Sequence, residues 1–180
     1  MAEPDTLYVN DAVRALIGVE SPLQWACDAV ERGSIRRMVH AIMDPDPIFS
    51  DPDFAGATRY DGPVAPPLFP VHMFQRGPAD PDPLEHAWKD ADYDGSKSPM
   101  AMFALPPVPI ALKRLLNAGV EVEFFRYAAL GERVSVVNRY ADIFEKKGRK
   151  GPMVFVVVER QFATARQELL LRYRQTLVYT

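Results

Sequence analysis

Residues 153–163 read MVFVVVERQFA, and this stretch decides the fold. Its short apolar run is rich in β-branched valine, which favours a strand over a helix. An uninterrupted apolar run of this kind is typical of a strand that is buried on both faces. The stretch therefore predicts a central strand of a sheet.

The sequence on both sides of this stretch predicts more strands. Apolar and polar residues alternate at 120–125, and residues 133–144 and 169–179 have similar β patterns. The charged segment EKKGRKG at 145–151 is predicted to be a hairpin loop, and short turns are expected at the other connections. Four strands joined in this way predict an antiparallel meander.

One amphipathic helix is predicted before these strands. Apolar residues with i, i+3, i+4, i+7 spacing form one face, and they are Ile35, Met38, Val39 and Ile42. We expect Ser34 to be the N-cap and Pro45 to end the helix. A fifth strand is expected at 25–29, and a second helix at 109–117. The pattern is α+β, with one antiparallel sheet and helices on one face.

Proline dominates the middle of the chain. Fourteen of the 17 prolines lie between Pro45 and Pro109, so this region is predicted to be mostly loop with short helices. The Pro- and Asp-rich segment at about 77–105 has the least predicted structure, particularly at 77–98, and a loop of this length is usually functional or partly disordered.

Composition limits the class of protein. A chain of 180 residues corresponds to about one domain, so residues 1–180 are expected to form a single one. The net charge of −3 argues against nucleic-acid binding, and no apolar stretch is long enough to cross a membrane. The single cysteine, Cys27, excludes an internal disulfide, and no signal peptide is recognised. We expect a cytoplasmic protein.

The loop after the helix raises the chemical question. Asp44 lies where the helix is predicted to end, and three prolines follow within the loop DPDPIFSDPDFA at 44–55. A carboxylate there could orient or activate a water molecule. The alternative is that Asp44, Asp46 and the later aspartates only stabilise turns and caps, which is a common role of Asp.

Several ordered segments resemble one family. They are ERGSIRR at 31–37, YDGPVAPPLF at 60–69, NAGVEVEFFR at 117–126, GERV at 131–134 and RYADIFEK at 139–146. Together they resemble the MaoC-like dehydratases, and more narrowly their N-terminal, FAS1-like dehydratase branch. The resemblance implies a hot-dog fold, in which an antiparallel sheet of five or more strands wraps around a central helix. It also implies reversible addition of water to an enoyl thioester, with coenzyme A or an acyl-carrier protein as carrier and no cofactor or metal.

Active members of this family carry a loop of the form G-D-x-N-P-[LI]-H-x-D, whose Asp and His hold one water and move its proton. The family Asp matches Asp44 and the Asn matches Asp46, but the His position is Phe49. A phenyl ring cannot exchange a proton. The resemblance places Asp46, Phe49 and the segment Val64, Ala65 and Pro66 at the substrate.

The sequence has only three histidines that could replace the missing one, and His86, in the acidic loop, is interpreted as solvated. His40 is one position away from the apolar helix face and is interpreted as a surface or boundary residue. His72, which follows the Pro66-Pro67 element, is the better candidate for a catalytic role beside Asp44.

The resemblance leaves three functions open. The first is a subunit of an (R)-specific enoyl-CoA hydratase, equivalently a 3-hydroxyacyl-thioester dehydratase, that supports acyl-chain binding for a catalytic hot-dog partner. The second is a homodimeric hydratase or thioesterase with a modified site. The third is a non-catalytic module that binds acyl thioesters. We expect a homodimer, or a heterodimer with a second hot-dog subunit, because hot-dog proteins usually pair.

Overall fold

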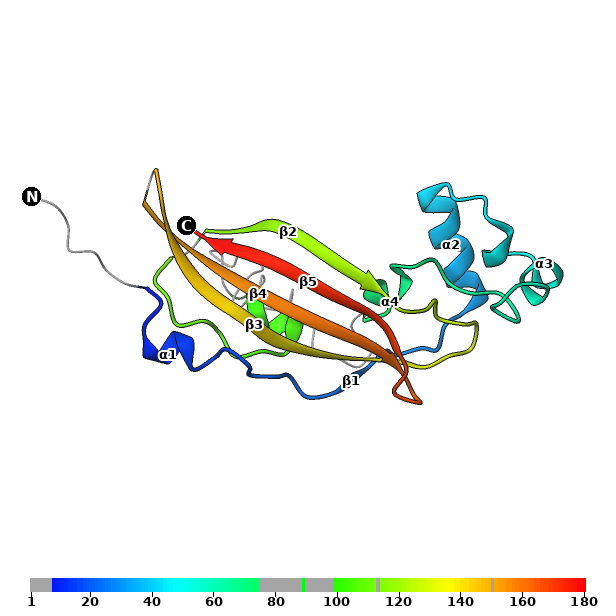
Figure 1. Ribbon diagram of the computed structural model, residues 1–180, viewed down its shortest axis with the longest axis horizontal. Helices are drawn as coiled ribbons and strands as arrows, with labels where there is room; N and C mark the ends of the chain where they lie inside the picture. The colour runs from blue at the N-terminus through cyan, green and yellow to red at the C-terminus, as the bar shows by residue number, and fades with distance from the viewer. Residues whose placement is uncertain (1–7, 75–88, 90–98, 113, 150) are drawn as a thin grey trace, which may run out of the picture.

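Five antiparallel strands form one sheet in the order β1-β3-β4-β5-β2 (Figure 1). The computed structural model describes residues 8–74, 89, 99–112, 114–149 and 151–180. The strands are β1 (Gln24–Trp25), β2 (Leu115–Phe124), β3 (Val134–Gly148), β4 (Gly151–Thr164) and β5 (Leu169–Tyr179). The expected α+β architecture with a five-stranded antiparallel sheet is confirmed.

The three long central strands follow the predicted pattern. Val154, Val156 and Val158 of β4 are fully buried on the face of the sheet that carries the core, and Val157 on the other face is 9% exposed. The prediction of a strand buried on both faces is therefore correct. The predicted loop at 145–151 is too long, because β3 pairs with β4 as far as Gly148 and Gly151. The charged side chains do not prevent pairing, since Lys146 lies over the Phe144 ring at 5.1 Å.

The position of β2 differs from the predicted meander. This strand pairs with β5, so only β3, β4 and β5 are joined as successive neighbours. The helix predicted at 109–117 is wrong, because Leu115 already begins β2 and pairs with Tyr179. Gly119, two residues after the predicted helix, has a positive φ of 152° beside a shift in the β2–β5 register.

The longest helix is α2 (Arg32–Ile42), which lies beyond one end of the sheet (Figure 1). Its apolar face is only partly covered, since Ile35 is 1% exposed but Ile42 is 48% exposed. Glu31 is the N-cap, whereas Ser34 lies inside the first turn. The helix ends at Met43, whose φ of 55° is left-handed, just before Pro45 as predicted.

The described part of the proline-rich region contains only short helices, as predicted. They are η1 (Pro47–Phe49), α3 (Pro52–Gly56), α4 (Phe69–His72) and η3 (Pro99–Phe103), and α1 (Asp11–Arg14) precedes β1. Most of the predicted loop at 77–105 lies outside the described residues. The strand expected at 25–29 is shorter and begins earlier, at 24–25, and Cys27 is exposed.

Two groups of buried residues form the core on one face of the sheet, which we call the inner face. The first includes Val13, Met100, Phe103, Tyr140 and Val156. The second lies toward α2 and includes Ile35, Phe49, Val64, Phe162 and Leu171. Within the described ranges, no helix is long and apolar enough to cross a membrane.

Candidate functional site

The loop after α2 is shaped by two aspartates in succession. The Asp44 Oδ1 accepts a hydrogen bond from the Asp46 backbone N–H at 3.1 Å. The Asp46 Oδ1 in turn accepts one from the Ile48 N–H at 3.0 Å and caps η1. Both carboxylates therefore act in turns, as the structural interpretation of this loop predicts. Asp44 is half-buried, and Asp46 is exposed.

Phe49 belongs to the core. The side chain is 5% exposed, and its ring lies 6.5 Å from the ring of Tyr127. Tyr127 also stacks on Tyr60 at 5.4 Å. The position that matches the family histidine is thus occupied by a packing residue in an aromatic group, with no group that could transfer a proton.

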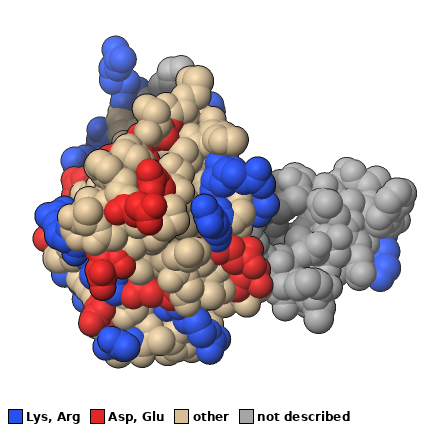
Figure 2. Space-filling view, turned by 90° about the vertical axis from the view of Figure 1, so that its right-hand side faces the viewer, with Lys and Arg blue, Asp and Glu red and all other residues tan. Residues whose placement is uncertain are grey.

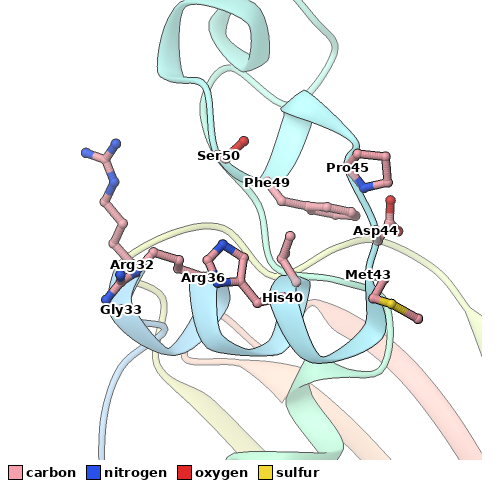
Figure 3. A pocket seen from close by; sticks show the side chains of 10 residues that line it. Arg32, Gly33, Arg36, His40, Met43, Asp44, Pro45, Phe49 and Ser50 are labelled. Carbon is pink, nitrogen blue, oxygen red and sulfur yellow. The ribbon is translucent and has the colours of Figure 1, made fainter.

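A cavity of about 770 Å³ lies between α2 and the loop at 45–50 (Figure 3). Asp44, Phe49 and His40 all line it. Arg32 and Arg36 also line it, and Figure 3 shows both toward the N-terminal end of the helix. Arg32, Arg36 and His40 are successive i, i+4 positions and therefore share one helix face.

His40 is the residue that the sequence reasoning missed. The apolar spacing placed it off the core face, which is correct because it is exposed. However, the side of α2 that carries His40 forms one wall of this cavity (Figure 3). No sequence spacing indicated this, because the left-handed Met43 ends α2 and takes Asp44 out of the helical repeat.

His72 lines a different cavity. That cavity has a volume of about 620 Å³ and lies on the other side of α2, with Ser34, Met38 and Phe69 among its walls. The structure therefore does not bring His72 and Asp44 into one cavity. Of the histidines in the described ranges, only His40 lines the cavity that Asp44 lines.

The segment predicted to contact substrate begins with two members of the second core group, Val64 and Ala65. Val64, Ala65 and Pro66 are all buried. The Ala65 N–H donates to the Ala128 carbonyl at 2.8 Å, and Val64 forms a bridge with Ala129. Val64 lines a third cavity of about 650 Å³, and none of the three lines the cavity at Asp44. Their role at a substrate stays a prediction.

Two arginines that line the third cavity have side-chain partners. In the third cavity Arg126 is bonded to Glu132, and Arg59 donates to the Tyr60 hydroxyl at 2.8 Å. That hydrogen bond raises the pKa of Arg59. Figure 2 views the molecule from the end at which α2 lies, and acidic and basic residues are interspersed there.

The basic β3–β4 hairpin lies at the opposite end of the sheet (Figure 1), so it is not a wall of the cavity at Asp44. Among the described residues, no group of His, Cys, Asp and Glu could hold a metal ion.

Comparison with known proteins relates these features to one family. Residues 15–172 match the family described as FAS1-like, dehydratase domain region. A search of curated proteins gave no match.

Solved structures share the fold. The ChsH1-ChsH2 complex from Mycobacterium tuberculosis contains a chain that is 21% identical, with a TM-score of 0.70 and coverage of 94% of this chain and 89% of that one. The HadBC (3R-hydroxyacyl-ACP dehydratase) complex from M. tuberculosis gives 16% identity, a TM-score of 0.57 and coverage of 87% and 93%. The (R)-hydratase from A. caviae is 12% identical, with a TM-score of 0.56 and coverage of 89% of this chain and 94% of that one. The chain has the hot-dog fold and belongs to the family described as FAS1-like, dehydratase domain region.

Proposed function

We propose that this chain is the non-catalytic subunit of an (R)-specific enoyl-CoA hydratase, equivalently a 3-hydroxyacyl-thioester dehydratase. In the reaction, a water oxygen adds to C3 of the enoyl thioester and a proton adds to C2. The partner hot-dog subunit would supply the complete Asp/His pair. This chain would support the acyl group and the interface.

The observation that carries the proposal is the state of the loop at 44–49. Phe49 is 5% exposed and packed against Tyr127, so the histidine position has become part of the core. The Asp44 carboxylate is engaged by the Asp46 N–H. Because Phe49 supplies no imidazole, this loop itself lacks the second group that general acid–base catalysis of this reaction uses.

The sheet edge supports a partner. β2 is the edge strand beside β5, and nearly all of its residues are exposed. Its large apolar side chains include Leu116, Val120 and Phe124, each between 41% and 46% exposed. A long, exposed apolar edge is unusual in a protein that stays alone, because its free backbone groups invite another strand. We propose that β2 pairs with the edge of a second hot-dog sheet.

The basic face of α2 supports an anionic carrier. Arg32 and Arg36 line a cavity whose other walls include Val39 and Phe49. An apolar cavity beside two guanidinium groups suits an acyl chain attached to a phosphate-bearing carrier, since guanidinium pairs with phosphate through charge-assisted hydrogen bonds. The proposed reaction uses water and no cofactor.

The decisive experiment is hydration of crotonyl-CoA and a longer enoyl-CoA by the isolated chain at high concentration, measured as loss of enoyl absorbance. We expect no turnover from folded protein, and turnover only after a hot-dog partner with the complete loop is added. Turnover by the isolated chain that Asp44→Asn abolishes would refute the proposal. Phe49→His is a matched test: a gain of activity in the isolated chain would show that the remaining site is intact and would argue against a requirement for a partner.

One observation favours a second candidate, a stand-alone hydratase or thioesterase with a modified site. His40 lines the same cavity as Asp44, which gives this cavity a second titratable group. His40→Asn would then remove activity, whereas His72→Asn would leave it unchanged. Tight binding of an enoyl-CoA without turnover, either alone or with a partner, would instead support the acyl-thioester binding module.

A further inference from the structure

The cavity at Asp44 has a floor made by one side chain. The described residues that line it are half-buried or exposed, except for Phe49, whose side chain is 5% exposed. Figure 3 shows the Phe49 ring in the space between α2 and the loop at 45–50. A ligand that enters this cavity from solvent therefore reaches its greatest depth at the Phe49 ring.

Two tyrosines lie behind this floor. The Phe49 ring is 6.5 Å from the ring of Tyr127, and Tyr127 stacks on Tyr60 at 5.4 Å with an interplanar angle of 6°. Tyr60 and Tyr127 line the third cavity, of about 650 Å³. Among the described residues, that cavity and the cavity at Asp44 share no lining residue. The row of three rings is therefore a partition between the two cavities.

Hydrogen bonds tie this partition at both ends. The Arg59 guanidinium donates to the Tyr60 hydroxyl at 2.8 Å. The Val64 N–H donates to the Ile48 carbonyl at 3.3 Å, so the loop that carries Phe49 is bonded to a wall of the third cavity. These bonds favour a fixed floor over a ring that turns aside when a ligand enters.

The walls above the floor are apolar near Phe49 and basic farther along α2. Val39 and Met43 line the cavity, and Arg32 and Arg36 line it toward the N-terminal end of the helix (Figure 3). An acyl chain whose anionic carrier lies at the two arginines would direct its methyl end toward the Phe49 ring.

We propose that the Phe49 ring, backed by Tyr127 and Tyr60, sets the longest acyl group that this chain accommodates. The inference rests on the proposed function, because it needs the acyl group to lie in the cavity at Asp44. Each methylene that is buried in an apolar cavity tightens binding ~4-fold. Affinity therefore rises with chain length until the methyl end meets Phe49, and it levels off beyond that length.

Calorimetric titration of the full chain with saturated acyl-CoAs, from butanoyl-CoA to hexadecanoyl-CoA, tests the inference, because saturated chains cannot be hydrated. In the wild type, the longest chains should bind within ~3-fold of one another, which is less than the gain from one buried methylene. Phe49→Leu lowers the floor, so hexadecanoyl-CoA should bind it ~10-fold more tightly than the wild type, as expected for about two further buried methylenes. Phe54→Leu, at an exposed position in α3, is the matched control and should leave the profile unchanged.

Val39→Phe provides a second variant that acts in the opposite direction. Val39 is half-buried on α2 and lines the cavity, so a phenyl ring there should fill part of it. The affinity should then level off at a shorter acyl chain than in the wild type. Far-ultraviolet circular dichroism establishes that each variant is folded, and Val39→Phe carries the test if Phe49→Leu does not fold.

The outcomes separate this inference from the proposed function. Affinity that keeps rising up to hexadecanoyl-CoA in the wild type, or that levels off at the same length in the wild type and both variants, would overturn the chain-length limit but not acyl binding. Equal affinity for butanoyl-CoA and all longer chains would overturn both. Turnover of crotonyl-CoA by the isolated chain would refute the non-catalytic role alone.

Discussion

Phe49 should be a major contributor to stability, which can be tested by Phe49→Ala. The side chain is 5% exposed and contacts the second core group near Tyr127. Truncating a buried Phe to Ala loses its transfer free energy and leaves a cavity, for a cost of ~3–5 kcal/mol in the free energy of unfolding. For a chain of this size, that corresponds to a fall in Tm of roughly 6–20 °C.

The assay is urea denaturation followed by far-ultraviolet circular dichroism, with Phe54→Ala as the matched control. Phe54 lies in the same loop region but is 48% exposed, so its truncation should cost less than ~1.5 kcal/mol. Phe49→His should fall between these two, because the imidazole would be buried where a phenyl ring packs. If Phe49→Ala and Phe54→Ala cost the same, the assignment of Phe49 to the core is refuted, and with it the main support for a non-catalytic subunit.

Three further changes test other parts of the structure. Glu159→Gln should lower the free energy of unfolding by ~1–3 kcal/mol, because its half-exposed arginine partners lose a buried carboxylate. The control is Glu123→Gln, an exposed ion-pair partner, which should cost under ~1 kcal/mol in the same urea denaturation experiment. Asp51→Ala removes the side-chain cap of α3 and should cost ~1 kcal/mol, measured as a shift in the urea midpoint. Burial raises the pKa of Tyr140 above its ordinary value of 10.0, so the folded chain keeps a proton that the unfolded chain releases. Stability should therefore fall as the pH rises past about 10, and a melting series should show a smaller fall for Tyr140→Phe.

The sequence predicted the strands better than their pairing. The uninterrupted valine-rich run located β4, and apolar–polar patterns located its neighbours, because burial of a strand face determines which positions are apolar. The strand that pairs with β2 could not be predicted from the sequence. Apolar–polar alternation indicates which face of a strand is buried, but it does not indicate which strand lies beside it. Leu115 and Leu116 fit a helix or a strand equally well in so short a segment, and pairing with β5 decided between them.

The part of the candidate site that depends on local backbone contacts could be predicted from the sequence. The turn roles of Asp44 and Asp46 depend on backbone groups two residues away, which the sequence contains. The choice between His40 and His72 depended on which side of α2 faces the loop at 45–50. That side is determined by how the loop folds back over the helix, and this is a tertiary property.

The strand order predicts that β2 joins the sheet after its three consecutive strands have paired. β3, β4 and β5 are consecutive along the chain, so they can assemble through short loop closures. β2 must instead find β5, whose residues lie on the far side of the β3–β4 hairpin in sequence. Contacts of large sequence separation form slowly, so the folding pathway should contain a three-stranded species before β2 docks. In pulse-labelled hydrogen exchange, amides of β2 should become protected after those of β3 and β4. Until then the edge of β5 is open to strands of other molecules, and a newly synthesised chain is most prone to aggregate during that interval.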